Sequence, residues 1–254
     1  MSRRIYFVFS LSCLLVAMAG VTGWAQGSRA ASAESYRQRG DQWQSKGEFD
    51  RAIEDYSLAL VFYPQDFDAY NNRGIARYSK GEFETAISDF NRAVALKPQT
   101  ASSFYNRGLA RKAAGDLDGA IADFDQALQL KPELTEAYNN RGNARRNRGD
   151  IAGAIADFDQ AIKLNPRLAE AYNNRGNAKL ASDDLAQAIA DYSQAIKLKP
   201  DYAVAYLNRG VAKQAQGDLA NAADDFDQAI KLNPQLRQML EQRTVEARAK
   251  ISNR

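Results

Sequence analysis

A period of 34 residues runs through most of the chain and limits the folds that it can adopt. Six glycines keep this interval, at Gly40, Gly74, Gly108, Gly142, Gly176 and Gly210. All six prolines keep it as well, at Pro64, Pro98, Pro132, Pro166, Pro200 and Pro234. A fixed period of this length indicates one structural unit that is copied and stacked. The copies are residues 33–66, 67–100, 101–134, 135–168, 169–202 and 203–236.

Each repeat contains two stretches with helical spacing. Counted from the first residue of a repeat, position 4 is aromatic, positions 20 and 27 are alanine, and position 24 is tyrosine or phenylalanine in every copy. Spacings of three and four residues place positions 20, 24 and 27 on one face of a helix. Glycine at position 15, replaced only by Asp183, predicts a left-handed end of the first helix, and proline at position 32 predicts the end of the second. We therefore expect two short antiparallel helices in each repeat.

Position 8 is glycine in all six repeats. Glycine inside a helix costs about 1 kcal/mol relative to alanine. Its recurrence predicts that the helices touch at close range here, with the aromatic residues of positions 4 and 24 filling the neighbouring space.

These residues resemble the tetratricopeptide repeat, whose pattern is an aromatic residue, Leu-Gly, a tyrosine and later Ala-x-x-x-Phe and Pro. The resemblance covers residues 33–236. It implies an all-α fold, a right-handed superhelical solenoid of six antiparallel helix pairs whose first helices line a concave groove. Residues 237–254 are expected to form a C-terminal capping helix that solvates the end of the stack. A partner-binding helix is the alternative for this segment.

Two positions depart from the family pattern together in every repeat. Position 7 is arginine instead of leucine, and position 23 is aspartate instead of a bulky residue. We interpret them as ion pairs that replace an apolar contact, because guanidinium and carboxylate can satisfy each other's hydrogen bonds. An arginine row that binds phosphate or carboxylate ligands is the alternative. The predicted structural pairs include Arg73 with Asp89, Arg107 with Asp123, Arg141 with Asp157, and Arg175 with Asp191.

Position 11, a tyrosine in the family, is basic from the second repeat onward. It lies four residues after position 7, so both side chains face the same side of the first helix. We expect acidic residues at positions 16 and 25 to neutralise it. Binding of an acidic ligand is the alternative.

Asparagines recur along the first helices, mainly at position 6. A side-chain amide offers donors and an acceptor that match those of a peptide bond. The predicted peptide-binding residues are Asn72, Asn106, Asn140, Asn143, Asn174, Asn177 and Asn208. The alternative is that the position-6 asparagines only tie adjacent first helices together. Lysines at positions 2 and 5, which the family's carboxylate clamp uses, are replaced in the fourth and fifth repeats by Glu and Asn, so we do not expect a clamp for peptide C-termini.

Residues 1–25 differ in composition from the repeats. Arg3 and Arg4 precede an apolar run over residues 5–21, and small residues follow, which is the layout of a secretory signal peptide. We predict cleavage after Ala25, with residues 26–32 as a short linker. An uncleaved anchor over residues 5–21 is the alternative. The protein is expected to be exported, either periplasmic or secreted, with membrane contact only through that anchor.

The composition excludes several kinds of chemistry. The chain has no histidine and one cysteine, Cys13, which lies in the apolar run. Without Arg3 and Arg4 the net charge of +3 falls to +1, which gives no general attraction to nucleic acid. The acidic residues recur with the repeat, as structural residues do, and no nucleophile–base pair, phosphate loop or metal spacing is present. We predict a noncatalytic protein without cofactor or metal.

The sequence favours an exported scaffold that binds an extended segment of a partner protein in its concave groove, in the assembly of an envelope or membrane complex. Main-chain hydrogen bonds to the asparagines would supply the affinity. The alternative is a noncatalytic accessory protein of envelope polysaccharide or lipoprotein biogenesis, which would bind glycan through asparagine and aromatic side chains.

Overall fold

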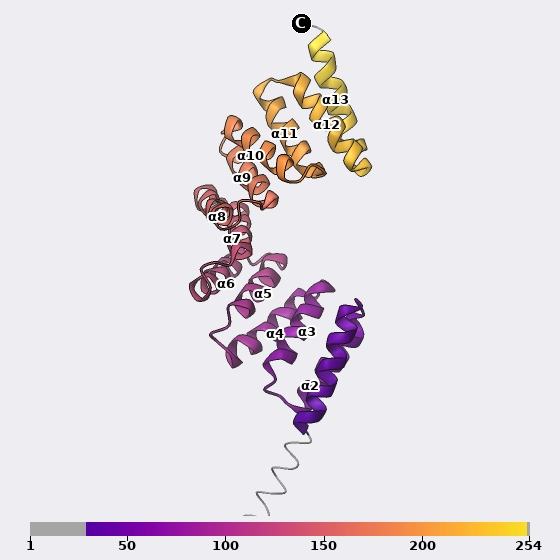
Figure 1. Ribbon diagram of the computed structural model, residues 1–254, viewed down its shortest axis with the longest axis vertical. Coiled ribbons are helices and arrows are strands. Elements are labelled where there is room, and N and C mark those ends of the chain that lie inside the picture. Colours follow the sequence, from indigo (N-terminus) through magenta and orange to yellow (C-terminus); the bar gives the residue numbers. More distant parts are fainter. Residues whose placement is uncertain (1–28, 253–254) are drawn as a thin grey trace, which may run out of the picture. The chain divides into compact units, whose positions relative to one another are not determined.

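The computed structural model describes residues 29–252, which divide into an N-terminal part, residues 29–99, and a C-terminal part, residues 100–252. Helices build both parts, and no strand occurs within the described residues (Figure 1). The N-terminal part holds the first two repeats, and the C-terminal part holds the other four together with a final helix. The predicted signal peptide, the alternative anchor and the predicted cleavage site lie outside the described residues.

The N-terminal part begins with a helix over residues 29–45. Three further helices follow, α2 (Phe49–Phe62), α3 (Phe67–Ser79) and α4 (Phe83–Leu96).

The first helix already includes residues 29–32, which the sequence led us to expect as a linker. Alanine is the strongest helix former, and two of the four residues are alanine. One turn later, Ala33 is buried in a cluster with Ala59, Leu60 and Ala69, which holds the start of the helix in place.

The C-terminal part contains four helix pairs and two final elements. The pairs are α5 (Ala101–Ala113) with α6 (Leu117–Leu130), α7 (Thr135–Arg148) with α8 (Ile151–Leu164), α9 (Ala169–Ala181) with α10 (Leu185–Leu198), and α11 (Ala203–Gln216) with α12 (Leu219–Leu232). The final elements are the short 3-10 helix η1 (Pro234–Leu236) and α13 (Arg237–Ser252).

Each helix in the C-terminal part packs against the next one along the chain. The first helices of successive repeats, α5, α7, α9 and α11, also contact one another, whereas the second helices in this part make no comparable contact. Stacked pairs that approach more closely on one side must curve toward that side. The first helices therefore form the inner side of this stack.

The residues at the helix ends have the conformations that the sequence predicted. Glycines after the first helices have positive φ, from 76° at Gly47 to 94° at Gly149. In the fifth repeat Asp183 takes this place with a φ of 62°, and it is the one non-glycine residue with positive φ in the described chain. Asp116 shows how the second helix then starts, because its side chain accepts a hydrogen bond from the backbone N–H of Gly119.

The repeated glycines mark the closest approach between the two helices of a repeat. A Cβ atom added at any of the six position-8 glycines would lie 2.6 to 2.8 Å from Cε1 of the aromatic ring at position 24. At Gly142, for example, the ring is that of Phe158, which is fully buried. The predicted close contact at position 8 is confirmed.

The end of the stack is covered by α13. Leu240 of this helix is fully buried against Ala222, Phe226 and Ala229 of α12, and Leu236 packs against the same cluster. The helix thus supplies apolar side chains where a seventh repeat would otherwise stand.

Ser103 departs from the packing of the other repeats. Position 3 is a fully buried alanine in the second and in the last three repeats, at Ala69, Ala137, Ala171 and Ala205. Ser103 is equally buried, and its hydroxyl has no hydrogen-bond partner among the described residues. An unsatisfied buried hydroxyl destabilises the folded state.

We predict that Ser103→Ala raises the free energy of unfolding by about 1 kcal/mol, because it removes the unsatisfied hydroxyl and improves helix propensity. Urea unfolding followed by circular dichroism measures this change. Ser102→Ala is the matched control, since Ser102 is exposed on the same helix turn and should gain only the smaller contribution of helix propensity. A loss of stability in Ser103→Ala would contradict the prediction.

Candidate peptide-binding face

The predicted arginine–aspartate pairs lie in contact in every repeat. In the fourth repeat, Arg141 Nη2 donates to Asp157 Oδ1 at 2.5 Å, and Arg141 Nε donates to Asp157 Oδ2 at 3.0 Å. Asp157 is only 2% exposed. The same pairing joins Arg39 with Asp55, Arg73 with Asp89, Arg107 with Asp123, Arg175 with Asp191, and Arg209 with Asp225.

The arginines also link successive repeats. The remaining nitrogen of Arg141, Nη1, donates to Asp125 of the preceding repeat at 2.5 Å. Arg175 reaches Asp159 in the same way, and Arg209 reaches the hydroxyl of Ser193. Each position-7 guanidinium also lies 5.1 to 5.6 Å from the centroid of the aromatic ring at position 4. The arginine row is therefore engaged within the stack, so its geometry gives no support to the alternative of a phosphate-binding row.

These contacts keep Arg141 charged although it is largely buried. Burial alone would lower the pKa of Arg141, but hydrogen bonds and charge from Asp157 and Asp125 outweigh it and raise the pKa above the ordinary value. In Arg175 the hydrogen bond to Asp191 is the largest cause of a raised pKa, burial opposes it, and Asp159 adds to the rise.

The cations at position 11 bind the same aspartates. Arg145 Nη1 donates to Asp157 Oδ2 at 2.9 Å, whereas its Nε lies 3.9 Å from Asp150 at position 16. Acids at positions 16 and 25 do lie within 4.0 Å of Arg145, as Asp150 and Asp125, but the position-23 aspartate is its closer partner. Position 11 lies one helical turn after position 7, so both side chains reach one carboxylate and share its two oxygens.

The position-6 asparagines hydrogen-bond to the preceding first helix. Asn174 Nδ2 donates to Asn139 Oδ1 at 3.0 Å, and Asn208 Nδ2 donates to Asn173 Oδ1 at 3.0 Å. Asn140 donates to the hydroxyl of Tyr105 at 3.1 Å. In the N-terminal part, Asn72 donates to Asp41 at 2.9 Å.

These bonds favour the alternative for position 6, in which its asparagines tie adjacent first helices together. Asn106 occupies the same position in α5.

The same bonds orient a second row of amides at position 5. The carbonyl oxygens of Asn139 and Asn173 accept from the next repeat, while their Nδ2 groups donate to no acceptor among the described residues. Asn173 is only 3% exposed. The Nδ2 group of Asn173, which has no acceptor among the described residues, is therefore held in a fixed orientation at a nearly buried position. Asn139 and Asn173 were not among the binding residues that we predicted from the sequence.

Position 9 differs between the fourth and fifth repeats. Asn177 accepts a hydrogen bond from the hydroxyl of Tyr192 at 2.9 Å. Phe158 stands at the place of Tyr192 in the fourth repeat and has no hydroxyl. Half-buried Asn143 has no hydrogen-bond partner among the described residues.

Positions 5, 9 and 12 are spaced by four and three residues and so lie on one stripe of each first helix. In the C-terminal part we call this stripe the first-helix face. It consists of Tyr105, Leu109, Lys112, Asn139, Asn143, Arg146, Asn173, Asn177, Leu180, Leu207, Val211 and Gln214. Amide groups thus occupy its centre, on α7 and α9, and apolar side chains occupy its end on α11.

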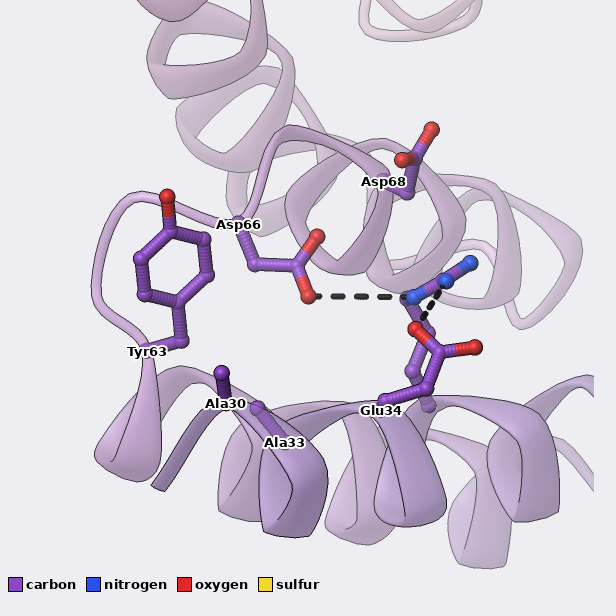
Figure 2. A pocket seen from close by; sticks show the side chains of 7 residues that line it. Ala30, Ala33, Glu34, Tyr63, Asp66 and Asp68 are labelled. Atoms are coloured by element: carbon purple, nitrogen blue, oxygen red, sulfur yellow. Dashed lines mark hydrogen bonds and ion pairs between the residues drawn. The ribbon is translucent and has the colours of Figure 1, made fainter. Parts of the chain in front are cut away.

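A separate hollow of about 250 Å³ lies in the N-terminal part (Figure 2). Its lining comes from the first helix, the end of α2 and the start of α3, and comprises Ala30, Ala33, Glu34, Arg37, Tyr63, Asp66 and Asp68. Arg37 donates to Glu34, and its Nε lies 3.7 Å from Asp66 Oδ2. Asp66 also accepts from the backbone N–H of Ala69. The charges around this hollow satisfy one another, so it carries no functional assignment.

Among the described residues, no group of His, Cys, Asp and Glu side chains could hold a metal ion. Within the same part of the chain, no helix has the length and apolar content needed to cross a bilayer.

Comparison with known proteins matches the repeats to one family. The model described as "TPR repeat" matches residues 40–81, 74–115, 110–147, 142–183 and 176–217, and the model described as "Tetratricopeptide repeat" matches residues 203–236. No curated protein matches the chain.

Solved structures share the fold at low identity. The pilF protein of Pseudomonas aeruginosa is 18% identical with a TM-score of 0.69, over 88% of this chain and 99% of pilF. A tetratricopeptide repeat protein from Parabacteroides merdae is 24% identical with a TM-score of 0.66, over 84% of each chain. YrrB, described as a TPR protein with an unusual peptide-binding site, is 21% identical with a TM-score of 0.60, over 78% of this chain and 99% of its own.

We predict that Asp157→Ala lowers the free energy of unfolding by about 3–5 kcal/mol, because it leaves the cations of Arg141 and Arg145 without their carboxylate. Arg141→Met should lower it by less than half as much, since Arg145 still pairs with Asp157. Denaturant unfolding of both variants gives the comparison.

Asp118→Ala is the control for this prediction, because Asp118 forms an exposed pair with Arg148 and should contribute little to stability. Equal effects of Asp157→Ala and Asp118→Ala would show that the buried pairs do not stabilise the stack.

Proposed function

The chain belongs to the tetratricopeptide repeat family, and from that premise we propose that it is an exported scaffold that binds an extended segment of a partner protein on the first-helix face. Repeat proteins of this kind act through extended surfaces on stacked helices. We propose neither a reaction nor a cofactor for this protein. The scaffold acts in the assembly of an envelope or membrane complex.

The observation that carries the proposal is the orientation of the position-5 amides. The carbonyl oxygens of Asn139 and Asn173 are held by Asn174 and Asn208, and this contact turns the unpaired Nδ2 groups into donors of fixed direction. An extended peptide offers carbonyl oxygens along its main chain. Donors in successive repeats can bind two such carbonyls without regard to the peptide's side chains.

Asn143 adds both a donor and an acceptor on α7, one helical turn after Asn139. Its amide has no partner among the described residues, so it can bind a peptide group through both atoms. YrrB, which has the same fold, is described as having a peptide-binding site. This supports peptide binding as a function that such a stack can carry.

The aromatic side chains do not favour glycan as the ligand. The rings at position 24 are fully buried or nearly so, and those at position 4 lie against the arginines of position 7. A protein segment therefore fits the first-helix face better, because most of its side chains are amides or aliphatic and Tyr105 is its one aromatic residue.

Export rests on residues 1–25, whose positive start, apolar middle and small residues before Gln26 match a secretory leader. We expect the protein to occur outside the cytoplasm with Gln26 as its first residue. Fractionation followed by amino-terminal sequencing of the purified protein tests this. An intact amino terminus in a membrane fraction would support the anchor over residues 5–21 instead, and a cytoplasmic protein would overturn export.

We predict that Asn139→Ala combined with Asn173→Ala weakens binding of the partner segment about 30-fold, because each lost hydrogen bond is worth roughly 1 kcal/mol. Crosslinking in the exported fraction would identify partners. Overlapping peptides from those partners would then be titrated against wild type and variant by fluorescence anisotropy.

The matched control combines Gln126→Ala with Gln160→Ala, because these exposed amides lie on the second helices of two adjacent repeats. Binding by the control should equal binding by the wild type. Weaker binding by both double variants would argue against the first-helix face, and so would unchanged binding by both.

A further inference from the structure

Lys112 and Arg146 differ from the other cations of the first helices in the C-terminal part. The cations at positions 7 and 11 pair with a buried aspartate in each of these repeats, as Arg107 and Arg111 do with Asp123. Lys112 and Arg146, at position 12 of neighbouring repeats, form no ion pair with any carboxylate among the described residues. Both are half-buried, so they are not merely solvated surface charges.

The contacts of Lys112 hold its ammonium group beside an amide. Lys112 Nζ donates to Asn140 Oδ1 at 2.6 Å, and Asn140 Nδ2 in turn donates to the hydroxyl of Tyr105 and to the backbone oxygen of Glu136. A lysine has three donors, and this contact uses one of them. Burial lowers the pKa of Lys112, so its charged form lacks the compensation that a carboxylate would give.

Arg146 lies one turn beyond Asn143 on the same stripe of α7. Its one described hydrogen bond is a long contact of 3.4 Å to Asn147. Its charge acts on the hydroxyl of Tyr192 in the next repeat, where it opposes the rise in the pKa of that group that burial causes. The charge of the guanidinium thus reaches the Tyr192 hydroxyl, most of its donors are unused, and Asn143, whose amide has no partner among the described residues, lies one helical turn before it.

Stabilisation of the helix ends explains these two residues poorly. Both stand in the last turn of a first helix, where a cation interacts favourably with the helix dipole. Arg111 and Arg145 already supply a cation in the same turns. Position 12 is Gln44, Tyr78, Leu180 and Gln214 in the other repeats, so a cation there is not a general requirement of the stack.

We propose that Lys112 and Arg146, together with Asn143, bind the carboxylate side chain of an aspartate or glutamate in the partner segment, an inference that rests on the proposed peptide binding. The two cations come from adjacent repeats, so one carboxylate lying across α5 and α7 can accept from both. The opposite end of the first helices carries Glu136 and Glu170, which repel a carboxylate. The acidic side chain therefore also sets the direction in which the segment lies.

The test uses a displayed library of random ten-residue peptides, each fused to its carrier at the carboxyl end. Such peptides have no free terminal carboxylate, so any preference for an acid must come from Asp or Glu side chains. The full chain and its Lys112→Met/Arg146→Met variant are used for selection side by side. We expect binders of the wild-type protein to share an acidic residue at one position, and binders of the variant to lack it.

One selected peptide is then resynthesised with its acidic residue changed from Glu to Gln or from Asp to Asn. Loss of the charge should weaken binding to the wild type about 10- to 100-fold, as for charge-assisted hydrogen bonds, and should weaken binding to the variant less than about twofold. Lys131→Met/Lys163→Met, which removes exposed lysines at the carboxyl ends of two second helices, is the matched control and should keep the full preference. Thermal unfolding checks that all variants are folded.

The outcomes separate this inference from the proposed function. Binders without an acidic preference, or a preference that persists in Lys112→Met/Arg146→Met, would overturn the carboxylate site and leave peptide binding in place. The absence of any binder to the wild type would overturn peptide binding itself, and the carboxylate site with it.

Discussion

The stack depends on a buried carboxylate in each second helix. An aspartate that is nearly inaccessible to water could not remain charged alone, because burial penalises an unpaired ion by several kcal/mol. In the fourth repeat, Arg141 and Arg145 of the first helix meet Asp157, and Arg141 continues to Asp125 of the preceding repeat. These ion pairs thus join the two helices of one repeat and also join that repeat to the preceding one.

The position-7 arginines point into the stack, so other side chains form the first-helix face. Because the guanidinium groups are engaged by aspartates and by aromatic rings, the inner side of the stack does not carry a continuous positive charge. Its polar groups are mostly amides, and the contact from Asn174 to Asn139 determines how those amides point. In the proposed function, stability and ligand contact therefore depend on different positions of the same helices.

Much of this fold could be predicted from the period and from residue chemistry. The glycine at position 8 predicted a close contact, and the ring of Phe158 occupies the space that a Cβ of Gly142 would need. The joint change to arginine and aspartate predicted pairs, because a buried charge needs an opposite charge. Asp183 could be placed in the left-handed region because it stands where the other repeats have glycine.

The orientation of the amides could not be predicted in the same way. Helical spacing places Asn139 and Asn140 next to each other on α7, but it does not say which amide meets the neighbouring helix. That depends on the offset between successive repeats, which the sequence period leaves open. Lys112 was missed for a related reason, since a lysine in the last turn of a helix looks like an ordinary solvated charge until its burial and its contact with Asn140 are known.

In a repeat protein, a ligand site is best sought at positions where the residues differ between repeats. Residues that hold the stack must recur in every copy, because every copy has the same neighbours to meet. In the fifth repeat Tyr192 satisfies Asn177, whereas in the fourth Phe158 leaves Asn143 without a partner. Arg146, one turn beyond Asn143, likewise has no counterpart in the fifth repeat, where Leu180 stands. Polar groups that are half-buried and unsatisfied are not explained by stacking, and a molecule that binds there would explain them most directly.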